Sequence, residues 1–170
     1  MRQTLILLSS LLMILSFATA NADNDTKPNW SAYSGAWFQI EYPPGFNARR
    51  SLDDSAFFIS PDNKVEFYVF SPQWKGEPTD FMLNSKTEKV VAHKEVETPK
   101  SKQAPWVTTT RWFTVKAKNG SYWRSWVDTE NTGGLNTRKV LGIKYRDQKA
   151  YNQYKSRYIR FKNSLIQYAD

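Results

Sequence analysis

Two strand-like segments joined by a tight turn constrain the fold of this chain more than any other feature. Residues 106–116 and 122–130 are rich in Trp, Thr, Val, Tyr and Phe, the aromatic and β-branched residues that favour strands. The turn between them, residues 118–121, contains Asn-Gly, the dipeptide that two-residue hairpin turns prefer. A looser turn with two glycines leads into a third segment of this kind, residues 137–145. Three consecutive antiparallel strands are therefore predicted.

Further strands are predicted on the N-terminal side of this hairpin. Residues 37–42 alternate apolar and polar side chains, which is the period of a strand with one buried face. Residues 56–59 and 65–70 flank a short turn that contains Pro and Asn, and this pattern indicates a second hairpin. Residues 89–97 also favour a strand, and their charges favour an exposed or edge position. A short helix is predicted after Thr79, which is suited to cap it.

The C-terminal segment changes from strand to helix periodicity. Aromatic and apolar residues recur every three or four positions between residues 147 and 168, with Asp147 suited to cap the first turn. Because an aromatic stripe must be buried, and the sheet offers the apolar surface for it, helices are expected to pack on the sheet. The predicted fold class is α+β, with an antiparallel β-sheet of about six or seven strands and helices packed on it, including a long C-terminal amphipathic helix.

The N-terminal residues have the pattern of a secretory signal peptide. Met1 and Arg2 precede an apolar run from Leu5 to Phe17, and residues 18–20 are the small Ala-Thr-Ala that signal peptidases accept. The run is too short to span a bilayer comfortably, and no second run follows it. The mature chain is therefore expected to be periplasmic or secreted, with no transmembrane segment.

This pattern also divides the chain. Residues 1–20 are predicted to be the signal peptide, with cleavage near residues 20–22. Residues 21–29 are polar without periodicity and are predicted to be a disordered lead-in. Residues 30–170 are predicted to form a single domain, because a chain of this length builds one compact core.

The composition limits the available chemistry. The chain has no cysteine, which excludes thiol catalysis, disulfides, cysteine-based metal sites and a lipoprotein anchor. The single histidine, His93, cannot form a histidine-rich zinc site, and no serine lies in a Gly-x-Ser-x-Gly pattern. We therefore expect no catalytic residue of these classes, no metal and no cofactor.

The net charge points to acidic partners. The formal charge of the chain is +8, and the chain stays basic when Arg2 is removed with the signal peptide. A basic surface favours anionic lipids, acidic glycans or an acidic protein face. The alternative is that the charge only keeps the protein in solution.

Aromatic and basic residues gather in the central hairpin. Trp residues at positions 106, 112, 123 and 126 lie close to Arg111 and Arg124 in sequence. Because side chains alternate along a strand, Trp123 and Trp126 must point to opposite faces, so both faces of the sheet carry aromatics. These aromatics either fill a core covered by helices or form an exposed groove that holds a partner. The candidate binding residues are Arg111, Trp112, Arg124 and Trp126.

Carboxylates offer an alternative site. Two suitably spaced acids can hydrolyse a glycosidic bond, and their separation in space decides whether they do. The candidates in this chain are Asp53, Asp54, Asp62, Glu66, Asp128 and Glu130.

Three motifs together resemble those of PsbP-like domains. They are residues 38–46 (FQIEYPPGF), residues 57–62 (FFISPD), and residues 142–145 (GIKY) with a following helix that closes in residues 161–165 (FKNSL). The resemblance spans most of the mature chain and implies an antiparallel sheet between helical layers. Members of this superfamily include an extrinsic subunit of photosystem II and a nuclear Ran-binding factor, which act by binding other proteins. The resemblance implies an accessory role and carries no catalytic motif.

These observations predict an exported, non-enzymatic binding protein. Its partner would be a protein complex or an anionic envelope component, recognised through a basic and aromatic surface, and no specific nucleic acid is expected. One alternative is a small cell-wall glycan hydrolase that uses two carboxylates. Another is an envelope protein whose charge binds anionic surfaces loosely and releases them at moderate salt.

Overall fold

The computed structural model describes residues 30–51, 54–134 and 136–168. The predicted signal peptide and lead-in lie outside these residues. The elements are β1 (Ser31–Ser34), β2 (Phe38–Tyr42), β3 (Asn47–Arg50), β4 (Ser55–Ile59), β5 (Val65–Phe70), the 3₁₀ turn η1 (Thr79–Phe81), β6 (Glu88–Thr98), β7 (Val107–Ala117), β8 (Trp123–Thr132), β9 (Thr137–Tyr145), α1 (Gln148–Asn163) and β10 (Ile166–Gln167).

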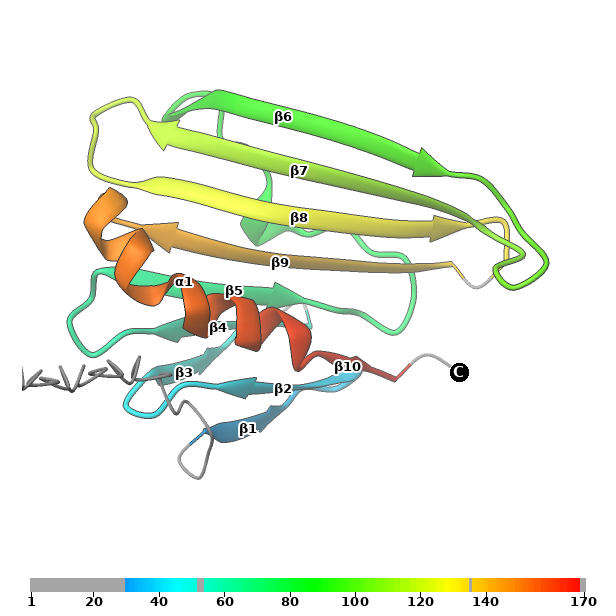
Figure 1. Ribbon diagram of the computed structural model, residues 1–170, viewed down its shortest axis with the longest axis horizontal. Helices are drawn as coiled ribbons and strands as arrows, with labels where there is room; N and C mark the ends of the chain where they lie inside the picture. Colours follow the sequence, from blue (N-terminus) through cyan, green and yellow to red (C-terminus); the bar gives the residue numbers. More distant parts are fainter. Residues whose placement is uncertain (1–29, 52–53, 135, 169–170) are drawn as a thin grey trace, which may run out of the picture.

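The strands form two antiparallel sheets (Figure 1). The larger one has seven strands in the order β3-β4-β5-β9-β8-β7-β6, and the smaller one has three in the order β1-β2-β10. The predicted central hairpin is confirmed, since β7 and β8 pair from Val107 opposite Thr132 to Lys116 opposite Trp123. Gly120 in its turn has φ +77°, a left-handed conformation that favours glycine. The described residues thus form an α+β structure that is mostly sheet.

The helix α1 begins where the sequence predicted and ends earlier. The carboxylate of Asp147 accepts a hydrogen bond of 2.8 Å from the backbone N–H of Ala150, which satisfies one free donor of the first turn. After Asn163 the chain leaves the helix, and β10 pairs with β2, so the last predicted helical residues lie in or beside a strand. Pairing with β2 gives the backbone of β10 partners that an isolated last helical turn would lack.

One face of the seven-stranded sheet packs against α1, and we call it the helix face. Its core contains Phe58, Phe67 and Ile143 of the sheet together with Tyr154 and Phe161 of α1. The strand β2 adds two further fully buried side chains to this core, Phe38 and Ile40. The helix contacts β9, β5 and β2, and β9 and β5 lie next to each other in the sheet.

A loop covers part of the opposite face, which we call the loop face. In that loop, residues 71–87, the ring of Phe81 stacks on Tyr68 with the ring centroids 4.4 Å apart. On its other side, Tyr68 lies against Gly142 of β9, where a Cβ atom would overlap the tyrosine ring. Helices were expected on both faces, but among the described residues this loop has only η1. Pro72, Gly76 and Pro78 in the loop disfavour a longer helix.

The strand β6 forms one edge of the large sheet, as its charges predicted. All of its residues after Glu88 are exposed, so neither of its faces is covered. Its pairing with β7 shifts between Val90 and Ala92, which marks a β-bulge at Val91. Within the described residues, no helix is both long and apolar enough to cross a membrane.

Candidate functional site

The helix face is open over β6 and β7. The helix α1 lies over β5 and β9, and β6 and β7 extend on the far side of β8 from it (Figure 1). Trp112 of β7 is 41% exposed there. Val127 of β8, opposite Trp112, is half-buried and packs against the edge of the main core. The sheet therefore presents an uncovered surface beside the helix.

The lysines of β6 to β9 gather on this open face. Lys116 pairs with Trp123, and Trp123 pairs with Tyr145 of the helix-face core, so all three side chains share that face. Lys89 lies opposite Lys116, and Lys94 lies opposite Trp112. Pairing with Thr129, two residues beyond Val127, places Lys139 on the same face. The remaining lysine of these strands, Lys144, pairs with Arg124 and therefore lies on the opposite face of the sheet.

The acidic residues of these four strands gather on the loop face. They are Glu88, Glu95, Glu97, Asp128 and Glu130, and each is paired across the sheet with a residue of that face. All the arginines of β6 to β9 point there too, and they neutralise the acids. Arg111 bonds Glu95 at 2.8 Å and Glu130 at 3.1 Å. Arg138 holds Asp128 through two hydrogen bonds of 3.0 and 2.8 Å.

The two faces of the same strands therefore differ in charge. We define the lysine–tryptophan face as Lys89, Lys94, Trp112, Lys116, Trp123 and Lys139. None of its four lysines forms an ion pair with a carboxylate in the part of the chain that the structure describes. Instead, the ammonium group of Lys94 lies 5.5 Å from the Trp112 ring centroid, and that of Lys116 lies 5.0 Å from Trp123. These cation–π contacts leave the positive charge available to a partner.

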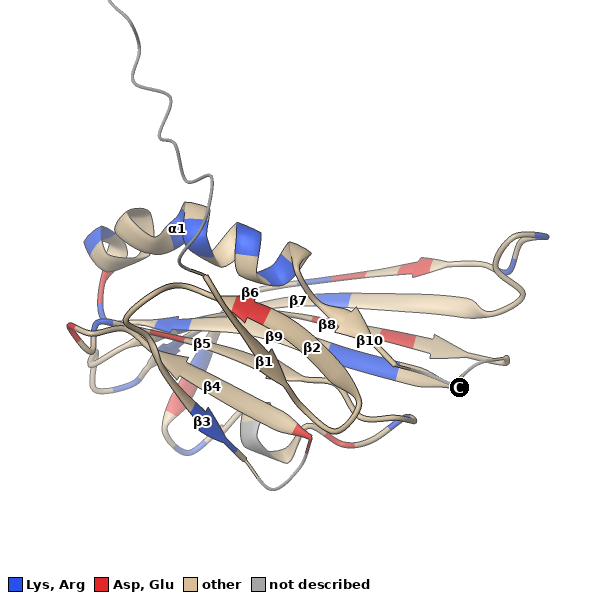
Figure 2. Cartoon of the chain, turned by 90° about the horizontal axis from the view of Figure 1, so that it is seen from below, with Lys and Arg blue, Asp and Glu red and all other residues tan. Residues whose placement is uncertain are grey.

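The helix adds positive charge beside this face. Figure 2 shows basic residues along α1 and no acidic ones, in agreement with its sequence. Tyr151 packs on Tyr145 of β9, and Lys155 and Lys162 follow it along the same side of the helix. Partial burial lowers the pKa of Lys162, whose ammonium group lies 5.1 Å from the ring centroid of Tyr158.

The structure separates the four predicted binding residues. Trp112 lies on the lysine–tryptophan face, whereas Arg111, Arg124 and Trp126 point to the loop face. Arg124 and Trp126 are only 8% and 7% exposed. The alternation that was predicted for Trp123 and Trp126 is confirmed, because they belong to opposite faces. Sequence reasoning missed the lysines, although Lys116 and Trp112 are four residues apart and must share a face.

Arg124 anchors the loop to the sheet. Its guanidinium donates to both carboxylate oxygens of Glu88, at 2.9 and 2.7 Å, and to the carbonyl oxygens of Phe81 and Met82 at 3.1 and 3.2 Å. It also stacks over the ring of Trp126, 4.7 Å from the centroid. Burial raises the pKa of the Glu88 carboxyl, but the hydrogen bonds from Arg124 and from the Asn84 backbone outweigh it, so that the pKa is lowered overall.

Basic side chains hold three of the candidate carboxylates, Asp62, Asp128 and Glu130. Asp53 lies outside the described residues, and Asp128 and Glu130 are held by basic side chains on the loop face. Hydrogen bonds from Lys75 and Arg111 lower the pKa of Glu130 against the effect of burial. Burial raises the pKa of Asp62, but hydrogen bonds from Ser60 and Lys64 outweigh this effect, so that the pKa is lowered overall. A glycosidase needs one acid whose pKa is raised, and these shifts run in the opposite direction.

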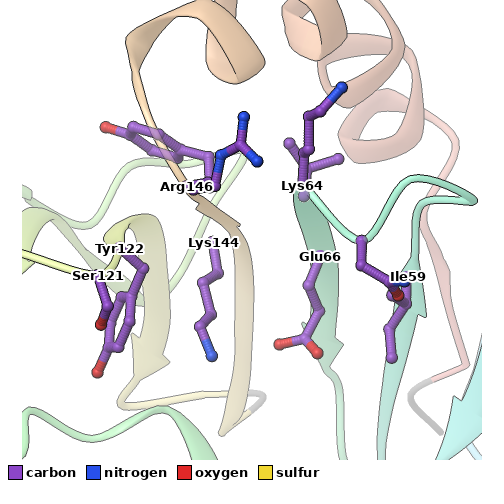
Figure 3. Close-up of a pocket in the computed structure, with 10 residues that line it drawn as sticks. Ile59, Lys64, Glu66, Ser121, Tyr122, Lys144 and Arg146 are labelled. Carbon is purple, nitrogen blue, oxygen red and sulfur yellow. The ribbon is translucent and has the colours of Figure 1, made fainter.

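A pocket of about 340 Å³ lies at the end of β5 and β9 (Figure 3). Lys144 and Glu66 are cross-strand neighbours and point to the same side of the sheet, with Lys144 4.6 Å from the Tyr122 ring centroid. Of the candidate carboxylates, Glu66 alone lines this pocket.

No group of three or more metal-ligating residues occurs in the described ranges. The single histidine, His93, stacks on Phe113 with ring centroids 4.3 Å apart.

Several solved structures are similar to this chain at low sequence identity. The chain is similar to the solution structure of cyanobacterial PsbP (CyanoP) from Synechocystis sp. PCC 6803, with 12% identity and a TM-score of 0.44 over 82% of this chain and 93% of that one. A crystal structure from Bacteroides thetaiotaomicron matches 84% of this chain and 49% of that one, with 12% identity and a TM-score of 0.39. No family model and no curated protein matches the chain. The first of these structures is of the PsbP kind that the sequence motifs resemble.

Proposed function

We propose that the chain is an exported, non-enzymatic binding protein, periplasmic or secreted, that recognises an anionic envelope component or protein complex. The lysine–tryptophan face is the proposed binding surface. One observation carries the proposal: in β6 to β9, every acid lies on the loop face with the arginines, while four lysines that pair with no carboxylate of the described residues share the helix face with two tryptophans. The signal-peptide pattern of residues 1–20 supports export.

Electrostatics explains why such a face suits an anionic partner. Lys89 and Lys116 lie directly opposite each other and repel one another, and a partner of opposite charge relieves that repulsion while it gains attraction. The exposed ring of Trp112 adds an apolar contact in the middle of the charged surface. Of the four binding residues that the sequence predicted, Trp112 remains in the proposed binding surface. We assign Arg111, Arg124 and Trp126 a structural role on the loop face.

The glycan hydrolase is the weaker candidate. Its two carboxylates would have to share a cleft with one acid protonated near neutral pH. The pKa values of Asp62, Glu88 and Glu130 are lowered instead, and the acid that shares a pocket with Glu66 is Glu88, whose carboxylate is held by Arg124. These observations favour binding over acid catalysis.

Affinity capture tests the proposal. The tagged protein is incubated with an envelope extract, and retained proteins and glycans are compared with those of the triple variant Lys94→Glu, Lys116→Glu, Lys139→Glu. The matched control changes the exposed lysines at positions 86, 102 and 149 to Glu, which alters the net charge equally outside the face. Loss of the partner in the first variant alone supports the proposed surface. Equal loss in both variants would show that only net charge matters, and unchanged capture in both would refute the surface.

A further inference from the structure

The lysines of the lysine–tryptophan face are spaced too widely for a small anion. Strand geometry, with about 3.3 Å per residue and about 4.8 Å between strands, places the Cα atoms of Lys94 and Lys116 about 14 Å apart. The same arithmetic places Lys139 about 16 Å from Lys94 and about 22 Å from Lys116. Lys89 and Lys116 are direct neighbours and act as one position. These separations exceed the Debye length of about 8 Å at physiological salt, so each position must meet its own anionic group.

The surface between the lysines is rich in hydroxyl groups. Thr110 and Thr129 form one cross-strand pair of this face, and Thr114 and Ser125 form another, on either side of Trp112 and Val127. The hydroxyl groups of Thr114 and Ser125 lie 3.1 Å apart and are partly exposed. A hydroxyl both donates and accepts hydrogen bonds, so these rows suit a ligand that is itself covered with hydroxyls.

The exposed ring of Trp112 suits the same kind of ligand. The face of an indole ring is electron-rich and attracts the partly positive C–H groups of a sugar ring that lies flat on it. The lysine–tryptophan face contains no arginine, whereas the centres of protein interfaces are enriched in arginine and depleted of lysine. A lysine acts on carboxylate and phosphate groups as a point charge that tolerates many geometries. A flexible polymer therefore fits this face better than a folded protein.

We propose that the lysine–tryptophan face binds an acidic polysaccharide, a linear glycan with repeated anionic groups. One sugar ring stacks on Trp112, and successive anionic groups meet Lys94, Lys139 and the pair formed by Lys89 and Lys116. This inference rests on the proposed function above, because it names the partner of the same surface.

Calorimetric titration with galacturonate oligomers, from the dimer to the decamer, tests the inference on the purified protein. Affinity should rise with length until the oligomer spans the lysine positions, and should then level off. Trp112→Ala should weaken binding of the decamer about tenfold, the size of one central aromatic contact, and Trp112→Phe should restore most of it. Lys94→Gln and Lys139→Gln should each weaken binding about threefold, as expected for one exposed ion pair, and Lys86→Gln should have no effect.

Further probes separate this inference from the proposed function. The methyl-esterified decamer lacks the charges and should not bind. A polyglutamate peptide or an anionic lipid vesicle that binds as tightly as the decamer, with Trp112→Ala as good as the unchanged protein, would overturn the glycan and leave the anionic surface in place. A decamer that binds no better than the dimer would also overturn the glycan. If no anionic probe binds and the charge-reversed variant captures its partners unchanged, both proposals fail.

Discussion

The middle of the large sheet and its β6 edge are built from the same kind of strand and are stabilised in different ways. In the central strands β5 and β9, most side chains on both faces are buried, because α1 covers one face and the loop covers the other. In β6, both faces are exposed after Glu88, and the strand is held by its pairing with β7 and by side-chain contacts such as Glu95 with Arg111. Burial of apolar side chains therefore stabilises the covered middle, whereas the distribution of charge distinguishes the two faces at the open edge.

The largest effect should follow from removing a buried ring from the core of the covered middle. Phe67 is fully buried and packs against Phe46, Tyr158 and Phe161, with ring centroids 5.0 to 5.4 Å away. Phe67→Ala should lower the free energy of unfolding by about 3 to 5 kcal/mol, because it removes buried surface and leaves a cavity. Urea denaturation measures the change. A loss below about 1 kcal/mol would show that α1 and the sheet close over the gap.

The next effect should come from the anchor between the loop and the sheet. Glu88→Ala leaves the buried guanidinium of Arg124 without its carboxylate, which should cost about 3 kcal/mol. Glu97→Ala is the matched control, since Glu97 lies on the same face of the same strand and is exposed. It should change stability by less than about 0.5 kcal/mol. Urea denaturation measures both losses of unfolding free energy. Equal losses in the two variants would show that Glu88 stabilises the fold no more than an exposed acid does.

Lowering the pH should destabilise the protein through the carboxylates of the loop face. The pKa of Glu88 and Glu130 is lower in the folded protein than the ordinary value of 4.5, so the unfolded chain binds more protons as the pH falls. Their contribution to stability is therefore complete at neutral pH and is lost as the pH falls below about 4.5. Urea midpoints between pH 7 and pH 3 should fall less steeply for Glu130→Gln than for the unchanged protein. Lys94→Gln should leave the slope unchanged, and parallel slopes for all three proteins would contradict the assignment.

The smallest effect is expected at the exposed tryptophan. Trp112→Ala removes a ring that is 41% exposed and one contact with Lys94. Its free energy of unfolding should fall by less than about 1 kcal/mol, although the same change should abolish most binding at this face. A larger loss of stability would mean that Trp112 supports the sheet, and its binding role would then need the Trp112→Phe variant to be established.

The regular elements could be predicted because their signals are local. The Asn119-Gly120 turn and the Asp147 cap each need only neighbouring residues, and both were placed correctly. The burial of Arg124 could not be predicted, because an arginine in a strand is ordinarily exposed and its partner Glu88 is 36 positions away. The short strand β10 was also missed, since it forms only by pairing with β2.

The lysine–tryptophan face was hidden for a related reason. Lys89 and Lys94 are five positions apart, and strict alternation would place them on opposite faces. The bulge at Val91 adds one residue and returns both side chains to the same face. Sequence reasoning therefore found the aromatic and basic composition of the hairpin but could not place both Lys89 and Lys94 of β6 on one face.

The contact between Tyr68 and Gly142 limits how this protein can change over evolution. Any larger residue at position 142 would have to displace a fully buried ring that is itself held by Phe81, so substitutions there should be removed by selection. The lysines of the open face lie outside the core, so they can change without disturbing it. Distant homologues should therefore share a glycine in β9 opposite a tyrosine in β5 more faithfully than they share the residues that bind.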